Sequence, residues 1–368
     1  MALIRGKGRD LRVDFFRGLA LFCIFLDHIP HDTLARFTVR NLALNDATEI
    51  FILLAGYAAS LVYGRKLDQA GPVSAGADML KRAWTLYIAH IFLFVIFTAE
   101  VALFAAWFAT PGYLARVGMD RLVREPLVAM IDAVPMLYQP SFLNVLPLYV
   151  VIMGGMAPLL LLLRRPRVLL AASFALYVAA RLFGWNLPTA GGHGWFFNPL
   201  TWQFLFVLGM IFARFGRPAL PRVATDVAAI ALLVMGFLIL LTTWIEPQLA
   251  RHVPVPINPL IRDIDKTGLH PYRLLSILSL AWLASRYVPP GAKFIETRLG
   301  SVFVLIGQHG LTTYCASIVL SFAGRVVLDH DPGWVMQIMV NGVGLGVLLG
   351  IAASGAWFRV KDAKPAVS

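Results

Sequence analysis

The feature that most constrains this chain is a series of apolar stretches, each long enough to cross a lipid bilayer. A helix needs about 20 mainly apolar residues for this, and about ten such stretches follow one another along the sequence. Their ranges are 13–30, 46–64, 83–108, 143–163, 167–184, 199–215, 224–244, 271–288, 299–321 and 334–357. The pattern predicts an all-α, polytopic integral membrane protein with about ten transmembrane helices.

Composition and charge support this class and exclude another. Only 14% of the 368 residues are charged and 59% are hydrophobic, whereas soluble proteins carry about 25% charged residues. The net charge of +12 could indicate a nucleic-acid-binding protein. However, the basic residues form short clusters between apolar stretches instead of one stripe, so we exclude nucleic acid and expect the lipid bilayer as the partner.

The distribution of Lys and Arg predicts the orientation. The two termini and the even-numbered loops carry about twice as many basic residues as the odd-numbered loops, which include Arg325. By the positive-inside rule, both termini are predicted to be cytoplasmic. The two longest loops, 109–142 and 245–270, then lie on the outer side, and their prolines and aromatics predict ordered caps.

No internal repeat, low-complexity tract or linker divides the chain, so residues 1–368 are interpreted as one transmembrane domain. No small-residue cleavage site follows the first stretch, which we interpret as an uncleaved span. The two cysteines, Cys23 and Cys315, lie inside apolar stretches. They offer neither a disulfide framework nor metal-ligand spacing, and no metal site is predicted.

The first stretch, DFFRGLALFCIFLDHI, carries Asp14, Arg17, Asp27 and His28. Ionisable groups inside a span are costly and usually face a cavity or a partner. Arg17 and His28 are eleven residues apart, which places them on one helix face about 16 Å apart. Asp14 is one turn before Arg17 and can pair with it. Two simpler readings stay open: an Asp14–Arg17 pair that anchors the helix, and an Asp27–His28 pair at the opposite membrane interface.

The second stretch begins NDATEIFILL, with Asp46 and Glu49 at its outer end, level with His28. A carboxylate there can orient the imidazole, as the acid of a hydrolase triad does. The alternative is that Asn45 or Asp46 caps the helix and Glu49 lies in its electropositive first turn. Capping is favoured for Asn45 or Asp46, and both roles stay open for Glu49.

Other polar residues are candidates with simple alternatives. His309 lies in the apolar segment LIGQHGLTTYCAS, where Gly307 and Gly310 permit close helix approach, and a buried, satisfied histidine is the default. In GGHGWFFNPLTWQFLF, the side chains of Asn198, Trp202 and Gln203 have the groups that sugar hydroxyls need, although an interfacial aromatic belt is commoner.

Several segments together resemble a known family. The R-x10-H spacing of Arg17 and His28 resembles the signature of the membrane acyltransferase-three superfamily. More closely, the chain resembles the OpgC family, inner-membrane proteins associated with succinylation of osmoregulated periplasmic glucans. The segments that carry this resemblance are LRVDFFRGLALFCIFLDHI, ATEIFILLAGYAASLVYGR, FLNVLPLYVVIMGGMAPLLL, FNPLTWQFLFVLGM and LGSVFVLIGQHGLTTYCAS.

The resemblance implies an O-acyltransferase of the bacterial inner membrane. Its donor would be cytoplasmic acyl-CoA, with succinyl-CoA implied by the family name, and its acceptor a hydroxyl of a periplasmic glucan or related polysaccharide. Acyl-CoA is a substrate, and no tightly bound cofactor is expected. Arg17 can hold a phosphate or polarise the acyl group, and His28 can take the proton of the attacking hydroxyl.

The remaining candidates fall into two groups. Glu49 is the third catalytic candidate. The orienting candidates are Asp14, Asp27, Asp46 and His309, and the substrate-binding candidates are Asn198, Trp202, Gln203 and Arg273. Direct transfer and an acyl-enzyme intermediate both stay open. The rival functions are a transporter of a carbohydrate, lipid-linked sugar or anion, with the buried charges along its path, and a scaffold subunit of a glucan-synthesis complex.

Overall fold

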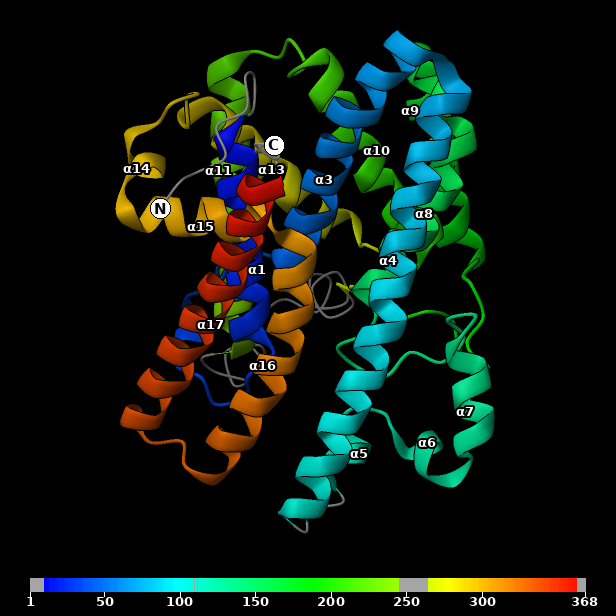
Figure 1. The fold of residues 1–368 in the computed structure, drawn as a ribbon. Coiled ribbons are helices and arrows are strands. Elements are labelled where there is room, and N and C mark those ends of the chain that lie inside the picture. The colour runs from blue at the N-terminus through cyan, green and yellow to red at the C-terminus, as the bar shows by residue number, and fades with distance from the viewer. Residues whose placement is uncertain (1–9, 109, 111, 245–263, 363–368) are drawn as a thin grey trace, which may run out of the picture. The chain divides into compact units, whose positions relative to one another are not determined.

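The computed structural model describes residues 10–108, 110, 112–244 and 264–362, and their regular structure is helical (Figure 1). Within these residues the β-type pairing is an isolated bridge between Pro188 and Gly194. The first part of the chain forms α1 (Leu11–Asp27), η1 (Leu34–Phe37), α2 (Val39–Leu42), α3 (Ala47–Ala59), the π-helical η2 (Ser60–Gly64), α4 (Arg65–Trp107), α5 (Gly112–Arg116), α6 (Asp120–Arg124) and α7 (Pro126–Ala133). The all-α prediction is confirmed.

The second part continues the same pattern. It forms α8 (Val145–Leu159), η3 (Leu160–Arg164), α9 (Pro166–Phe183), α10 (Pro199–Phe215), α11 (Arg222–Trp244), α13 (Pro271–Tyr287), α14 (Lys293–Glu296), α15 (Arg298–Gln308), α16 (Gly310–His330) and α17 (Trp334–Asp362).

Six helical stretches of the described chain are long and apolar enough to cross a membrane. They are Ala47–Trp107, Val145–Arg164, Pro166–Phe183, Arg222–Leu241, Gly310–His330 and Trp334–Phe358. The first of them contains two of the predicted spans, because Gly71 adopts a φ of 81° that breaks the helix, and the chain reverses there (Figure 1). The chain is a membrane protein by these helices, whereas the number ten and the side on which the termini lie stay predictions.

The chain forms two compact units. Unit 1 consists of Met1–Phe51, Val223–Leu240 and Ile277–Ser368, and unit 2 consists of Ile52–Arg222 and Leu241–Ser276.

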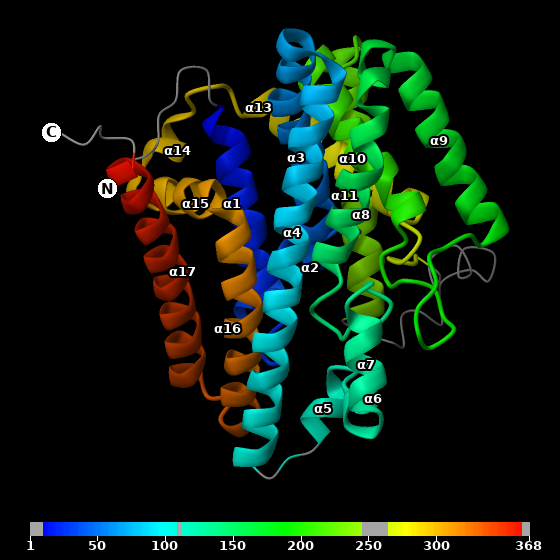
Figure 2. The same cartoon turned by 45° about the vertical axis from the view of Figure 1, so that its right-hand side comes forward.

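Unit 1 is built on α1, which packs against α15 and α16, while α17 packs against both of these (Figure 2). Two glycines bring α1 and α15 into backbone contact. A Cβ atom on Gly18 would stand 1.9 Å from the Phe303 carbonyl oxygen, and one on Gly307 would stand 1.8 Å from the Asp14 carbonyl oxygen. The prediction that Gly307 permits close helix approach is therefore confirmed.

The predicted span 299–321 is wrong as a single helix. It is divided between α15 and α16, which run in different directions in Figure 1, and His309 at the joint has non-helical angles (φ −112°, ψ 34°). The Ile306 carbonyl oxygen at the break accepts a hydrogen bond of 3.2 Å from the His309 N–H and lies 3.0 Å from the Thr313 hydroxyl. α16 then continues to His330, so Arg325 lies in a helix and not in a loop.

Unit 2 contains a second contact of this kind and an ordered loop. A Cβ on Gly56 would stand 2.0 Å from the Phe206 oxygen on α10. The predicted loop 109–142 includes α5, α6 and α7, and Arg121 and Asp132 form an ion pair of 2.7 Å within it. Residues 112–142 are ordered as predicted, and their place on the outer side stays a prediction. Of the other predicted cap, 245–263 lies outside the described residues.

Candidate functional site

One end of α1 carries the predicted arginine. Asp14 is buried, and its Oδ1 lies 3.9 Å from Nη1 of Arg17 in an i,i+3 ion pair. The aliphatic part of Arg17 rests on the start of α16, since a Cβ on Gly310 would stand 3.3 Å from Arg17 Cδ. Asp14, Arg17 and the joint at His309–Gly310 therefore gather in one place, which we call the Arg17 end of α1.

His309 fills this joint. Its side chain is 6% exposed, and a Cβ on Gly355 of α17 would stand 2.5 Å from its Nδ1. The imidazole therefore occupies the space that this glycine leaves. A packing role for His309 is visible, and its predicted role as an orienting residue of the site stays a prediction.

The opposite end of α1 carries the predicted base. His28 follows the last residue of the helix, and its Nδ1 lies 2.6 Å from the Ile24 carbonyl oxygen. A carbonyl only accepts hydrogen bonds, so Nδ1 must carry the proton. In the neutral ring the lone pair is then on Nε2, which is the atom that can take a proton. A general base that acts through Nε2 requires this tautomer, and the catalytic role of His28 stays a prediction.

Asp27 fastens the segment that follows His28. The Thr38 hydroxyl donates to Oδ1 of Asp27 at 2.5 Å, and Arg40 Nη1 donates to the Asp27 carbonyl oxygen at 3.3 Å. The carboxylate thereby holds the turn that contains η1 and α2 against the end of α1. We call this region, with His28 at its centre, the His28 end.

The Asp46–Glu49 pair forms a capping box at the start of α3. Asp46 Oδ1 accepts a hydrogen bond of 2.7 Å from the Thr48 backbone N–H, and Glu49 Oε2 accepts one of 3.0 Å from the Asp46 N–H. This is the reciprocal pattern expected of an acidic residue three positions after a cap. The capping interpretation of Asp46 is confirmed. Glu49 is fully buried, and its action on His28 stays a prediction.

The predicted sugar-binding residues lie in unit 2, where their polar groups hold the fold. Asn198 caps α10 through the Leu200 N–H, and its amide donates to the Trp185 oxygen at 2.6 Å. The indole N–H of Trp202, which is fully buried, lies 3.1 Å from the Thr267 oxygen.

Gln203 and Arg273 complete the predicted set. Gln203 accepts from the Ser173 hydroxyl at 2.6 Å and donates to the Ser173 oxygen at 2.9 Å. Arg273 lies part-buried in the first turn of α13. Sugar binding by these residues stays a prediction, and the geometry gives the first three a structural role.

The sequence interpretation missed polar residues of α16 and α17 near the His28 end. Arg325 and Asp329 are four apart on α16, with Nε 3.9 Å from Oδ2, and Asn341 on α17 donates to Asp32 Oδ1 at 3.0 Å. The R-x3-D spacing is a signal for a helical ion pair. It was lost because the predicted span ended at residue 321.

A family model described as OpgC protein matches residues 9–360. The chain belongs to the OpgC family. This match confirms the closer of the two resemblances, while the link to the wider acyltransferase-three superfamily stays a prediction. No curated protein and no solved structure matched the chain.

Proposed function

We propose that this OpgC-family chain is a membrane O-acyltransferase that moves an acyl group from acyl-CoA to a hydroxyl of a periplasmic glucan or related polysaccharide. The observation that carries this proposal is the family match over residues 9–360. The acyl group that the family name implies is succinyl. In this proposal the protein lies in a bacterial inner membrane with both termini in the cytoplasm, the donor arrives from the cytoplasmic side and the acceptor from the outer side.

The first element of the mechanism is His28. The sugar oxygen attacks the thioester carbonyl carbon while Nε2 of His28 takes the hydroxyl proton. The new C–O bond forms, the C–S bond breaks, and the proton passes from His28 to the CoA thiolate, so free thiol and ester are the products. The Nδ1 bond to Ile24 supports this role because it fixes the tautomer.

The second element is Arg17. Its guanidinium has five donors in a planar fork, and Nη1 lies 3.9 Å from Oδ1 of Asp14. A planar fork of donors suits a phosphate of CoA, whose long arm would then extend toward His28, about 16 Å away along α1. In this proposal Asp14 positions Arg17, and the close contact of α1 with α15 fixes both.

The test is the acylation of periplasmic glucans in a deletion strain, measured by mass spectrometry after complementation. Wild type should restore an acyl mass increment, and the mass identifies the acyl group. His28→Ala should reduce the increment by about 10²- to 10⁴-fold, the usual contribution of a general base. Membrane abundance of each variant is measured in parallel.

His330→Ala is the matched control. His330 ends α16 as His28 follows α1, and its Nδ1 lies 2.8 Å from the Val326 oxygen four residues before it. Removing it deletes the same local bond without touching the proposed base, so full acylation is expected. Full acylation by His28→Ala would disprove the base assignment. No increment with wild type would disprove the glucan acyltransferase proposal and favour the transporter.

A further inference from the structure

Three parts of unit 1 bring polar side chains together near His28. His31 and Asp32 come from the turn after α1, Arg325 and Asp329 from α16, and Asn341 from α17. The contacts that connect them are His31 Nε2 to Asp329 Oδ1 at 4.0 Å, Arg325 Nε to Asp329 Oδ2 at 3.9 Å, and Asn341 to Asp32 at 3.0 Å. We call these five residues the polar cluster.

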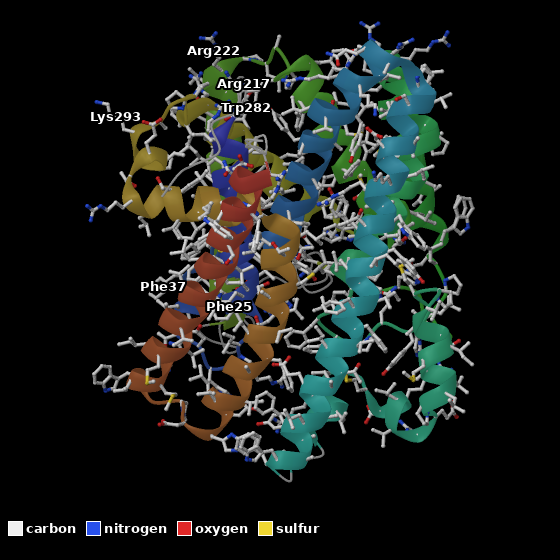
Figure 3. The ribbon with its side chains drawn as sticks, viewed as in Figure 1. Phe25, Phe37, Arg217, Arg222, Trp282 and Lys293 are labelled. Atoms are coloured by element: carbon white, nitrogen blue, oxygen red, sulfur yellow. The ribbon has the colours of Figure 1, made fainter. Side chains whose placement is uncertain are left out.

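The packing of α16 on α1 determines where along the axis of α1 this cluster lies. The Ser321 hydroxyl donates to the carbonyl oxygen of Phe25, a residue labelled in Figure 3, at 2.9 Å. A Cβ on Gly324 would stand 3.0 Å from Ile29 Cδ1. Arg325, the next residue, is therefore level with the end of α1 that carries His28.

The cluster contains buried polar atoms without hydrogen-bond partners among the described residues. They are Nε of Arg325, Oδ2 of Asp32 and Oδ1 of Asn341. Asp32 is 4% exposed and Asn341 is 7% exposed. Burying polar groups unpaired is costly, so a partner that is not part of the protein is expected at this position.

The backbone at the cluster is also unusual. His31 has a φ of 68°, in the left-handed region that residues other than glycine seldom adopt. Such conformations persist where the surrounding structure imposes them, and they concentrate at binding and catalytic sites. The side chain of His31 is well exposed, at 64%. The cluster is therefore reachable from the surface.

The charges decide between kinds of ligand. Two carboxylates, Asp32 and Asp329, accompany one guanidinium, with the imidazole of His31 beside Asp329, and the nearby Asp27 carboxylate is bonded to Thr38. With Arg40 at the Asp27 carbonyl counted as well, an anion would meet three carboxylates and two guanidinium groups here. The unpaired atoms include one donor and two acceptors, and a hydroxyl group both donates and accepts.

We infer that the polar cluster is the subsite that binds hydroxyl groups of a neutral carbohydrate acceptor beside His28. This inference rests on the proposed function. Arg325 donates to a sugar oxygen, while Asp32 and Asn341 accept from sugar hydroxyls. The bound sugar is then level with the imidazole that takes its proton.

The experiment measures acyl transfer by the purified full chain in lipid nanodiscs, with succinyl-CoA and unsubstituted periplasmic glucan as the two probes. Arg325→Met removes the donors but keeps the length of the side chain. We expect the KM for glucan to rise at least tenfold while the KM for succinyl-CoA stays unchanged. The melting temperature is measured in parallel, because Arg325→Met also removes the ion pair of 3.9 Å with Asp329 Oδ2.

Two further variants serve as controls for this experiment. Arg325→Lys keeps the charge and loses the fork, so an intermediate glucan KM is expected. Arg36→Met, at an exposed position of the same region, should behave as wild type.

The outcomes separate the inference from the proposed function. If wild type transfers no acyl group to glucan, the proposed function itself fails. If wild type does so and Arg325→Met keeps the wild-type glucan KM, the inference alone fails. A rise in the KM for succinyl-CoA instead would assign the cluster to the donor. A lower melting temperature with both KM values unchanged would make Arg325 a structural residue.

Discussion

The two ends of α1 differ in how they are closed. At the Arg17 end the backbones of α1 and α15 touch through Gly18 and Gly307, and the charged pair lies against the joint between α15 and α16. At the His28 end the helix stops, the chain turns, and buried donor and acceptor atoms lack partners among the described residues. The first end is closed by backbone contact, and the second is where we have proposed that the acceptor binds.

This difference matters for a transfer reaction. In acyl transfer the acyl-CoA must be held at a fixed position along α1, whereas the sugar that accepts the acyl group must enter and leave the site. Rigid packing around Arg17 suits the first task, and the polar turn around His28 suits the second. Substitutions at the two ends should therefore fail in different ways.

The largest effect is expected from Gly307→Ala, which disrupts the backbone contact at the Arg17 end of α1. The added Cβ would stand 1.8 Å from the Asp14 carbonyl oxygen, and a backbone atom cannot rotate away. Overpacking costs about 1–3 kcal/mol or more, so we expect low membrane abundance and a lower melting temperature in detergent. Gly346→Ala on α17 is the control, because no atom lies within 4 Å of its Cβ position. Equal stability of the two variants would show that α1 and α15 are not locked together.

Arg17→Ala should leave the fold largely intact and impair transfer. The loss of charge-assisted hydrogen bonds to the donor predicts a rate lower by about 10- to 100-fold. Arg17→Lys should recover part of the loss, because it restores the charge but not the planar fork. The measurement is the initial rate against acyl-CoA concentration. If Arg17→Ala had wild-type kinetics, Arg17 would serve only to anchor the helix in the membrane.

Glu49 separates capping from catalysis. The amide oxygen of Gln can still accept the Asp46 N–H, so Glu49→Gln should keep the capping box and the melting temperature. Glu49→Ala should lose about 1 kcal/mol of stability. If the carboxylate also orients His28, the Gln variant transfers acyl groups about tenfold more slowly. A Gln variant at full rate would leave capping as its whole role.

The smallest effect concerns Asp10, which caps α1 beyond Arg17. Burial alone would raise its pKa, but the hydrogen bonds and charge of Arg12 outweigh it and hold the pKa below the ordinary value of 3.8. A lowered folded-state pKa contributes stability that is present above the ordinary value and is lost as pH falls through the folded-state value. Melting curves between about pH 5 and pH 3 should therefore show a smaller acid-induced loss for Asp10→Asn than for wild type. An identical acid dependence would show that this pair does not respond to pH.

Much of the fold could be predicted because local patterns decide it. Apolar length predicts the helices, and the Asp46-x-x-Glu49 spacing predicts the capping box that the structure contains. The break at His309 could not be predicted in this way. Its flanking residues are apolar, and the break lies beside a backbone contact with α1, nearly 300 residues away in the sequence.

The site was predicted unevenly for the same reason. Arg17 and His28 stand out because ionisable groups are rare in apolar helices. The sequence predicted Trp202 as a sugar-binding residue. In the structure its indole N–H instead faces the backbone carbonyls of Lys266 and Thr267, which are more than 60 residues away in the sequence. Arg325 could not be recognised, because only the three-dimensional packing shows that its buried Nε has no hydrogen-bond partner among the described residues.

The glycine contact between α1 and α15 also has a mechanical consequence. With no side chains between the two backbones, neither helix can slide past the other without forcing a carbonyl oxygen into a Cα atom. If Arg17 moves during turnover, α1 and α15 must therefore move together as one rigid unit. The non-helical residue His309, between α15 and α16, is the hinge about which this unit can rotate relative to α16.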